Sequence, residues 1–401
     1  IFLLKYISGS IDSTCVSDEC RYIEYSQNIL RGFYSPPAPD INLISGPGYP
    51  LYLIPFQILG IERTGLIISN ILLSSFIVGL LFFSSRLFIK YRISIILSSI
   101  WGFYYIHYHS IFSAHSEVLA TFLFLSSFFC FSLFKISDKK TLLISSAFLF
   151  SFLVLTKVIF SYVLLFIFII SILTSFIRKR HTSILVFSLT ALIFTLPYQV
   201  YTYKLTGIPF YFSTQAGEQL YWMSTPHKGE FGEWQNNKFD ANCNFIPDEV
   251  PCNKELYKKN HGKFYNQISS LSSLDRDKIM KKKAIINIKQ YPLKYFRNIS
   301  SNITRMFFNI PNSYFYQRDI TTTARLIPNS ILLTLILFSG LLTLKYFPLF
   351  PDSLKLYFII TLTYLLLSSL VSAYPRMLNI SIPVILPWLG YTLSRWRDKK
   401  F

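Results

Sequence analysis

Apolar runs recur along this chain of 401 residues, and each is close to the roughly 20 residues that a helix needs to cross a bilayer. Only 15% of the residues are charged, against about a quarter in an average soluble domain. Because the runs repeat along the chain, the sequence predicts an all-α polytopic membrane protein. The runs are residues 64–85, 93–111, 118–134, 142–156, 158–177, 183–203, 326–344, 354–373 and 378–394.

Residues 1–7 are apolar but too few to span a membrane, and we expect them to end a truncated first transmembrane helix. With that helix the sequence predicts roughly ten spans. Residues 51–59 are short as well and are expected to re-enter the membrane or lie at its surface. The polar segment 204–325 predicts an α-rich loop domain outside the membrane. The expected units are an N-terminal transmembrane module (1–203) with its first outer loop at 12–60, the loop domain (204–325), and C-terminal transmembrane helices (326–401).

Lysines and arginines gather in short loops between the runs, at residues 86–92, 135–140, 178–180 and 395–400. Such loops normally face the cytoplasm. Strict alternation of the runs then places the remaining polar segments on the outer face, and no basic loop contradicts this. The net charge of +19 is explained by orientation and by contact with anionic membrane lipids, so nucleic acid is not expected as a partner. The outer segments are 18–51, 113–117, Lys157, 204–325 and 374–376.

Ionisable side chains lie at the ends of several spans on this outer face. Such groups are costly near a membrane and are therefore candidates for function. Carboxylates there can abstract a proton, and cations can bind a phosphate. The sequence thus predicts one pocket in which both kinds of group meet. Its candidate residues are Asp18 and Glu19 in the first outer loop, and Glu117, Lys157 and Arg376 at span ends.

Short segments spread along the chain resemble integral-membrane glycosyltransferases of the GT-C superfamily. They are most similar to the dolichyl-phosphate-mannose–protein mannosyltransferases and the bacterial aminoarabinose transferase of lipid A. The similar segments are Asp18-Glu19-Cys20-Arg21-Tyr22, Gly46-Pro47-Gly48-Tyr49-Pro50-Leu51, Ser116-Glu117-Val118-Leu119, residues 209–226 and residues 283–295. Tyr374-Pro375-Arg376-Met377 departs from the Arg-Tyr-x-x-Pro pattern common at that place.

This resemblance implies a polyprenyl-phosphate sugar donor, used by an inverting displacement, with a lipid, glycan or protein as acceptor. Asp18 is then the expected general base and Glu19 the second choice. Lys157 and Arg376 become candidates for binding the donor phosphate, with Arg21, Tyr22, Tyr49 and Glu117 around them. The resemblance also implies a bacterial inner membrane location with the active site facing the periplasm.

No cofactor is required by these residues, although some members of the superfamily use a divalent metal. His227 and His261 have no cysteine or carboxylate at zinc spacing, so no metal site is predicted there. Cys15/Cys20 and Cys243/Cys252 are close pairs in polar loops, and each is either a disulfide or two thiols.

Two other functions fit a chain of this composition. A lipid or sugar flippase places charged or broken helices near the bilayer midplane, often in repeated halves. The spans here carry almost no charge and form no matching halves. A polysaccharide polymerase or ligase also uses large outer loops, but the Asp-Glu signature of the first loop fits it less well.

Overall fold

The structure is a computed structural model that describes residues 18–111, 115–178, 182–235, 254–314 and 320–398, and these residues contain helices but no strand. Six of the helices are long and apolar enough to cross a membrane. Two further apolar helices, α7 (Lys140–Thr156) and α8 (Ile159–Arg178), are shorter in their apolar part. The chain is therefore an all-helical protein of the polytopic membrane type. The six are α4 (Glu62–Arg86), α6 (Glu117–Ser137), α9 (Thr182–Thr206), α16 (Ile320–Tyr346), α17 (Asp352–Val371) and α18 (Pro375–Arg397).

One predicted span is not a continuous helix. Within residues 93–111, α5 (Tyr91–Gly102) ends after 12 residues, which is about 18 Å at the helical rise per residue. The chain then turns into the short 3-10 helix η1 (Tyr105–Ser110). The turn is held by the ring of His107, which stacks on that of Trp101 with 4.3 Å between centroids. The sequence predicted one helix over these residues, whereas the structure has α5 followed by η1 between α4 and α6. Hydropathy alone does not detect this turn.

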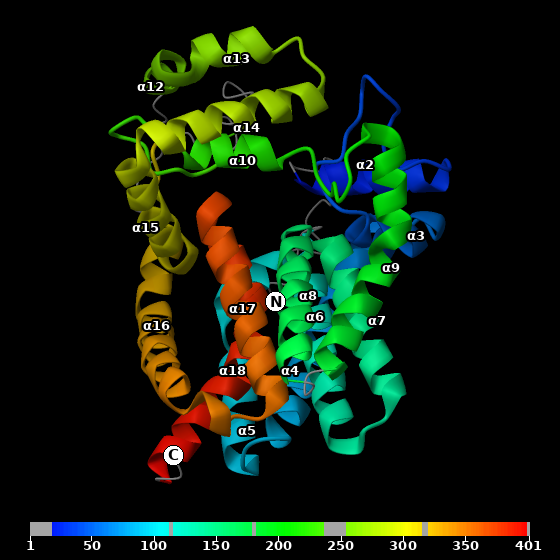
Figure 1. The fold of residues 1–401 in the computed structure, drawn as a ribbon, viewed down its shortest axis with the longest axis vertical. Helices are drawn as coiled ribbons and strands as arrows, with labels where there is room; N and C mark the ends of the chain where they lie inside the picture. Colours follow the sequence, from blue (N-terminus) through cyan, green and yellow to red (C-terminus); the bar gives the residue numbers. More distant parts are fainter. Residues whose placement is uncertain (1–17, 112–114, 179–181, 236–253, 315–319, 399–401) are drawn as a thin grey trace.

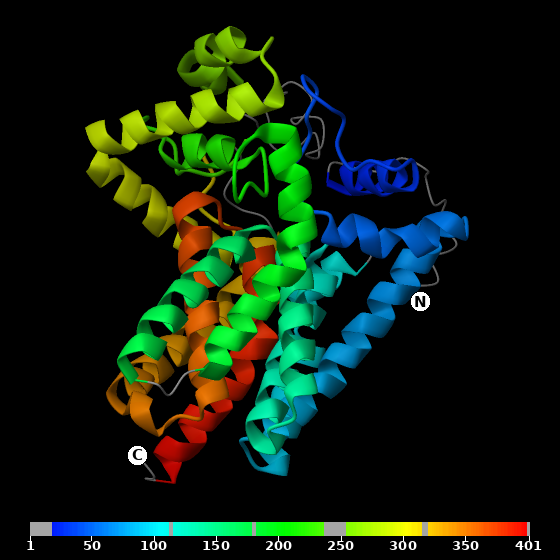
Figure 2. The same cartoon turned by 45° about the vertical axis from the view of Figure 1, so that its right-hand side comes forward.

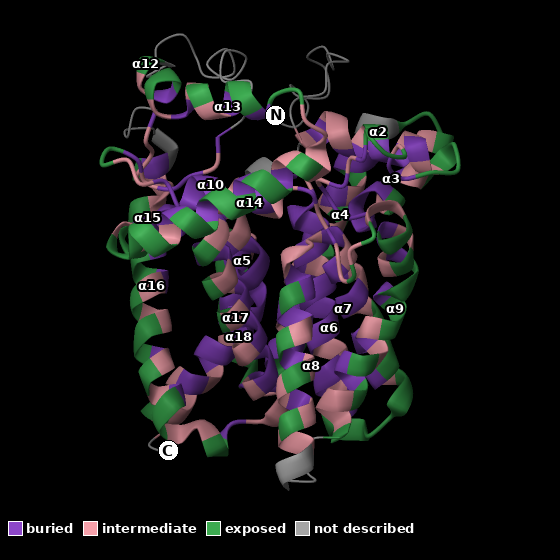
Figure 3. Cartoon of the chain, turned by 45° about the horizontal axis from the view of Figure 1, so that its top comes forward, coloured by how far each residue is buried: buried purple, intermediate pink, exposed green. Residues whose placement is uncertain are grey.

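The spanning helices differ in how far they are buried (Figure 3). In α6 and α18, 78% of the apolar window is buried, against 22% in α16. Aromatic packing fills the centre, where the Tyr357 hydroxyl lies 2.6 Å from the Ser127 hydroxyl. Helices α6 and α18 therefore form the core, and the peripheral helices α4, α9 and α16 expose apolar faces of the kind that lipid covers.

The polar segment folds as a separate helical unit at one end of the long helices (Figure 1). We call it the α10–α15 unit. It has its own small core, which includes the buried side chains of Trp222, Tyr257, Tyr265 and Met280. Its elements are α10 (Ala216–Met223), α12 (Lys254–Tyr257), η3 (Lys258–Gly262), α13 (Lys263–Ile268), α14 (Ser273–Gln290) and α15 (Pro292–Phe308).

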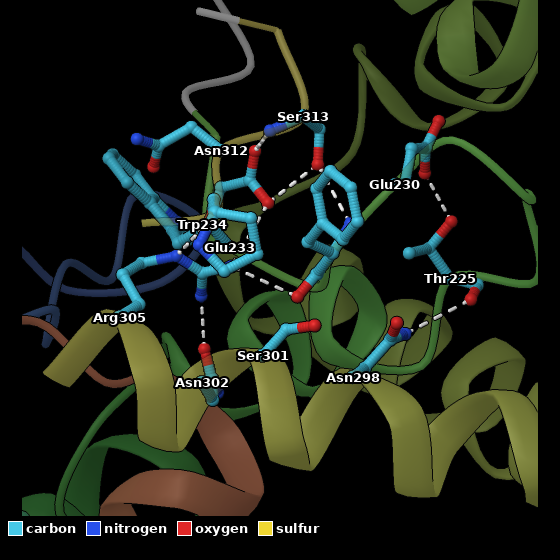
Figure 4. Close-up of polar contacts among 12 residues, drawn as sticks. Thr225, Glu230, Glu233, Trp234, Asn298, Ser301, Asn302, Arg305, Asn312 and Ser313 are labelled. Carbon is cyan, nitrogen blue, oxygen red and sulfur yellow. Dashed lines mark hydrogen bonds and ion pairs between the residues drawn. The ribbon is translucent and has the colours of Figure 1, made fainter. Parts of the chain in front are cut away.

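The polar face of α15 connects this unit to its neighbours (Figure 4). The Arg305 side chain is fully buried and lies 3.4 Å from Glu233 Oε2. Glu233 also accepts a hydrogen bond from the Ser313 hydroxyl at 2.6 Å. Asn298 and Asn302, which match sequence patterns for glycosylation, donate to backbone carbonyls and are buried. They are structural residues, since a buried amide cannot accept a glycan.

The first loop forms two short helices, α2 (Asp18–Leu30) and α3 (Gly48–Ile58). They lie across the end of α4, at the same end of the molecule as the α10–α15 unit (Figure 2). A Cβ atom on Gly46 would lie 2.2 Å from the Leu155 carbonyl oxygen, and one on Gly48 would lie 2.5 Å from Thr156 Oγ1. The two glycines therefore allow the loop to pack directly on the junction between α7 and α8. Residues 51–59, expected at the membrane surface, lie mostly within α3, and residues 1–7 lie outside the described residues.

Candidate active site

Asp18 begins α2 and forms two ion pairs. Its Oδ1 lies 2.7 Å from Arg21 Nη2, one helical turn later. Its Oδ2 lies 3.0 Å from Nη1 of Arg376, at the start of α18. A carboxylate at the first turn of a helix also interacts favourably with the helix dipole. The two arginines hold the Asp18 carboxylate between the first loop and the last span.

Arg376 also lies close to a second carboxylate, that of Glu117. Its Nε lies 3.8 Å from Oε1 of Glu117, the first residue of α6. The same Oε1 lies 2.7 Å from Nζ of Lys157, at the junction of α7 and α8. Four segments far apart in sequence therefore meet in one set of alternating charges. We call it the charged network: Asp18, Arg21, Glu117, Lys157 and Arg376.

The members of the network differ in exposure. The Glu117 side chain is only 4% exposed, whereas that of Arg376 is 42% exposed. Burial alone would raise the pKa of Asp18, but the charges of Arg376 and Arg21 outweigh it and hold that pKa well below its usual range. Asp18 is thus a carboxylate over the whole physiological range. Because the network has three cations and two carboxylates, an anion is the ligand that its exposed side favours.

The buried side of Glu117 faces a small cavity between α4, α5, α6 and α18. Glu117 Oε2 has no hydrogen-bond partner among the described residues, and neither do polar atoms of Ser74, Trp101 and Asn379. All four of these residues line the cavity. Such a set of donors and acceptors suits a hydroxyl group or a water molecule.

The two tyrosines predicted for the site are buried beside the network, and the Arg21 guanidinium lies over the Tyr22 ring at 5.7 Å from its centroid. Tyr22 and Tyr49 are buried, and their rings meet edge to face at 4.8 Å. The Tyr22 hydroxyl lies 3.2 Å from the Ser116 hydroxyl, directly before Glu117. In this structure the two rings pack against the residues that carry the network. Glu19 is also buried, and none of the described residues forms an ion pair with it.

His115 lies beside this site and was not among the residues predicted for it. The charges of Glu117, Arg376, Asp18 and Lys157 all act on its ring, although burial is the largest effect and lowers its pKa. Its position two residues before Glu117, the first residue of α6, was the signal that could have identified it.

Metal ligands gather elsewhere. Within the part of the chain that the structure describes, three residues of the α10–α15 unit could hold a metal ion: His227, Glu230 and His261. The sequence predicted no metal site at the two histidines, but the fold places Glu230 beside both of them. Of the cysteines, Cys20 is disulfide-bonded, whereas Cys15, Cys243 and Cys252 lie outside the described residues.

No family model matches the sequence, and no curated protein and no solved structure matches the chain.

Proposed function

We propose that this chain is a membrane glycosyltransferase that moves a sugar from a polyprenyl-phosphate donor to a lipid, glycan or protein acceptor. The observation that supports this most is the charged network. It combines an ionised carboxylate, Asp18, with an exposed cation, Arg376, at one end of a bundle of apolar helices. A phosphate carried by a lipid would reach such a site from the membrane, and a polar acceptor would reach it from the aqueous side.

The reaction is an inverting displacement. The acceptor hydroxyl oxygen attacks the anomeric carbon of the sugar, and its proton passes to the Asp18 carboxylate. The bond between the anomeric carbon and the phosphate oxygen breaks, and its electron pair leaves with the phosphate. Arg376 and Lys157 stabilise the negative charge that develops on that oxygen.

The resting ion pairs make Asp18 a weak base, since both of its oxygens are bound by arginine. Binding of the sugar donor would make Asp18 a stronger base. A phosphate that takes Arg376 as its partner withdraws that cation from Oδ2 of Asp18. The pKa of the carboxyl group then rises towards its usual range, and the released oxygen can accept the acceptor proton. Proton abstraction thus depends on donor binding, which limits wasteful chemistry in the empty site.

The proposal includes a GT-C fold of roughly ten spans and a bacterial inner membrane location, with the charged network facing the periplasm. The basic short loops support this orientation, because residues 86–92 and 135–140 lie at the opposite helix ends. There Lys135, near the end of α6, lies 3.2 Å from Asp352 at the start of α17. Glu117 stands at the other end of the same α6 helix.

The test is a transfer assay with the purified full chain in nanodiscs. The donors are a panel of radiolabelled polyprenyl-monophosphate sugars, and the acceptors are glycolipid and glycoprotein fractions of an envelope extract. We expect Asp18→Asn to lower the rate by about 100-fold or more, as loss of a general base does. Glu24→Gln is the matched control, because Glu24 is an exposed carboxylate on the same helix. Full activity of Asp18→Asn would refute the role of Asp18.

Two other outcomes would refute the whole proposal. Transfer only from pyrophosphate-linked oligosaccharides would identify a polymerase or ligase. Movement of labelled lipid across proteoliposomes, with no new glycosidic bond, would identify a flippase.

A further inference from the structure

A second polar cluster lies in the α10–α15 unit and takes no part in the charged network. Glu230 and His261 are almost fully buried, and His261 Nε2 lies 3.0 Å from both carboxylate oxygens of Glu230. His227 is partly exposed, and its ring centroid is 5.2 Å from that of His261. A ligand atom from each of the three residues lies within 4.8 Å of the other two.

We propose that His227, Glu230 and His261 bind one divalent transition-metal ion, with Zn²⁺ as the probe. Two imidazole nitrogens and one carboxylate oxygen are a ligand set that Zn²⁺ favours, with a fourth position open to solvent. This goes beyond the proposed function and does not depend on it.

The spacing of the three side chains fits a metal after a small adjustment. Metal–nitrogen distances of about 2.0–2.1 Å place neighbouring ligand atoms of a tetrahedral site about 3.3 Å apart. The Glu230–His261 distance of 3.0 Å is already close to this value. His227 has the longest distance to cover, and it is also the most exposed of the three. His227 begins a turn in which the Glu230 backbone N–H donates to the His227 carbonyl. The proposal requires rotation of this one side chain to bring its nitrogen to ligand distance.

The groups around the ligands hold them in the required orientation. The Tyr221 hydroxyl lies 2.7 Å from His261 Nδ1, so it can accept an N–H there while Nε2 binds a metal. Asn260 and Tyr314 each donate to Glu230 Oε1 at 2.6 Å, and Thr225 donates to Oε2. Metal ligands are commonly fixed by such contacts, which raise their affinity for the ion.

The position of the site indicates its role. Glu230 and His227 follow α10, whereas His261 lies in η3, about 30 residues later. A metal here would join the turn after α10 to η3 across the aromatic core, where the His261 ring contacts that of Trp222 at 4.4 Å between centroids. The metal would therefore stabilise the α10–α15 unit.

The test measures metal binding by the full chain, purified with a tag that contains no histidine. After removal of metal by a chelator, the protein is titrated with Zn²⁺ against a chromogenic chelator, and bound zinc is counted by mass spectrometry. We expect one Zn²⁺ per chain and a higher unfolding temperature when Zn²⁺ is bound. Binding of Co²⁺ should give the strong visible absorption of a tetrahedral site.

The decisive variant is His227→Asn, because it removes a ligand and leaves the buried Glu230–His261 pair intact. We expect it to weaken Zn²⁺ binding by about 100-fold or more and to abolish the stabilisation by zinc, while the metal-free protein keeps its unfolding temperature. Glu255→Gln, an exposed carboxylate in nearby α12, should bind zinc as the unchanged protein does. No saturable zinc binding, or equal binding by His227→Asn, would overturn the proposal and leave an ordinary buried pair.

Discussion

Lys157→Met should destabilise the protein strongly, because it leaves Glu117 as a buried charge. The Lys157 Nζ lies 2.7 Å from Glu117 Oε1, and the Glu117 side chain is only 4% exposed. At 2.7 Å, and with an effective dielectric constant of about 20, the gross attraction is about 6 kcal/mol. Desolvation of both groups offsets much of this. Removal of one partner of a buried pair usually costs about 3–5 kcal/mol.

Arg376 reduces the expected loss. Its Nε remains 3.8 Å from the same oxygen, but solvent screens it because the side chain is 42% exposed. We therefore expect Lys157→Met to cost about 3 kcal/mol, at the lower end of the observed range. For a chain of 401 residues this lowers the unfolding temperature by about 3–4 °C. Thermal unfolding in a mild detergent is the assay.

A double-mutant cycle tests the explanation. Glu117→Gln removes the charge and keeps an oxygen that can accept a hydrogen bond, so the double variant with Lys157→Met should regain at least half of the lost stability. The control is the pair Lys135–Asp352, whose side chains are 32% and 44% exposed. Lys135→Met should cost under about 1 kcal/mol. If the Glu117–Lys157 coupling is no larger than the control coupling, the pair is not a buried one in the folded protein.

Two further predictions concern other parts of the molecule. Gly48→Ala should cost about 1–3 kcal/mol, since its Cβ would lie 2.5 Å from Thr156 Oγ1. Gly79→Ala in α4 should be neutral or stabilising in thermal unfolding, since its Cβ would meet no described atom within 4 Å beyond its chain neighbours and the backbone of its own helix. Burial raises the pKa of Glu218 to about 7, so the folded state binds its proton more tightly than the unfolded state. Stability contributed by this group is complete below pH of about 4 and is lost as pH rises through about 7. Glu218→Gln should remove that loss, measured as unfolding temperature against pH; an unchanged pH dependence would contradict it.

The sequence predicted the helical membrane architecture because hydropathy over about 20 residues is a local property. It also predicted that the ionisable ends of several spans would share one face, and the structure brings Asp18, Glu117, Lys157 and Arg376 into one network. The alternation of spans predicts this shared face, because it determines on which side of the membrane each loop emerges. It did not give the partner of each charge, which depends on how the helices pack.

The failures have a common physical cause. The helix expected at residues 93–111 is broken after Gly102, where the His107 ring packs on Trp101, a contact between side chains that hydropathy does not represent. The Glu230 carboxylate beside His261 was not predicted, because the two residues are about 30 positions apart in sequence and only the tertiary fold brings them together. In both cases a contact made on packing decided the local structure.

The two polar sites differ in a way that explains why one is proposed for an anion and the other for a cation. In the charged network the cations outnumber the carboxylates, and the most exposed member is Arg376, so an incoming phosphate meets positive charge first. In the other site the Glu230 carboxylate accepts from neutral donors and faces an imidazole nitrogen, and the nearby Lys294 ammonium binds the Glu230 backbone carbonyl and not the carboxylate. Loss of metal binding in His227→Asn should therefore leave the Glu117–Lys157 coupling unchanged, because no residue is shared between the two sites.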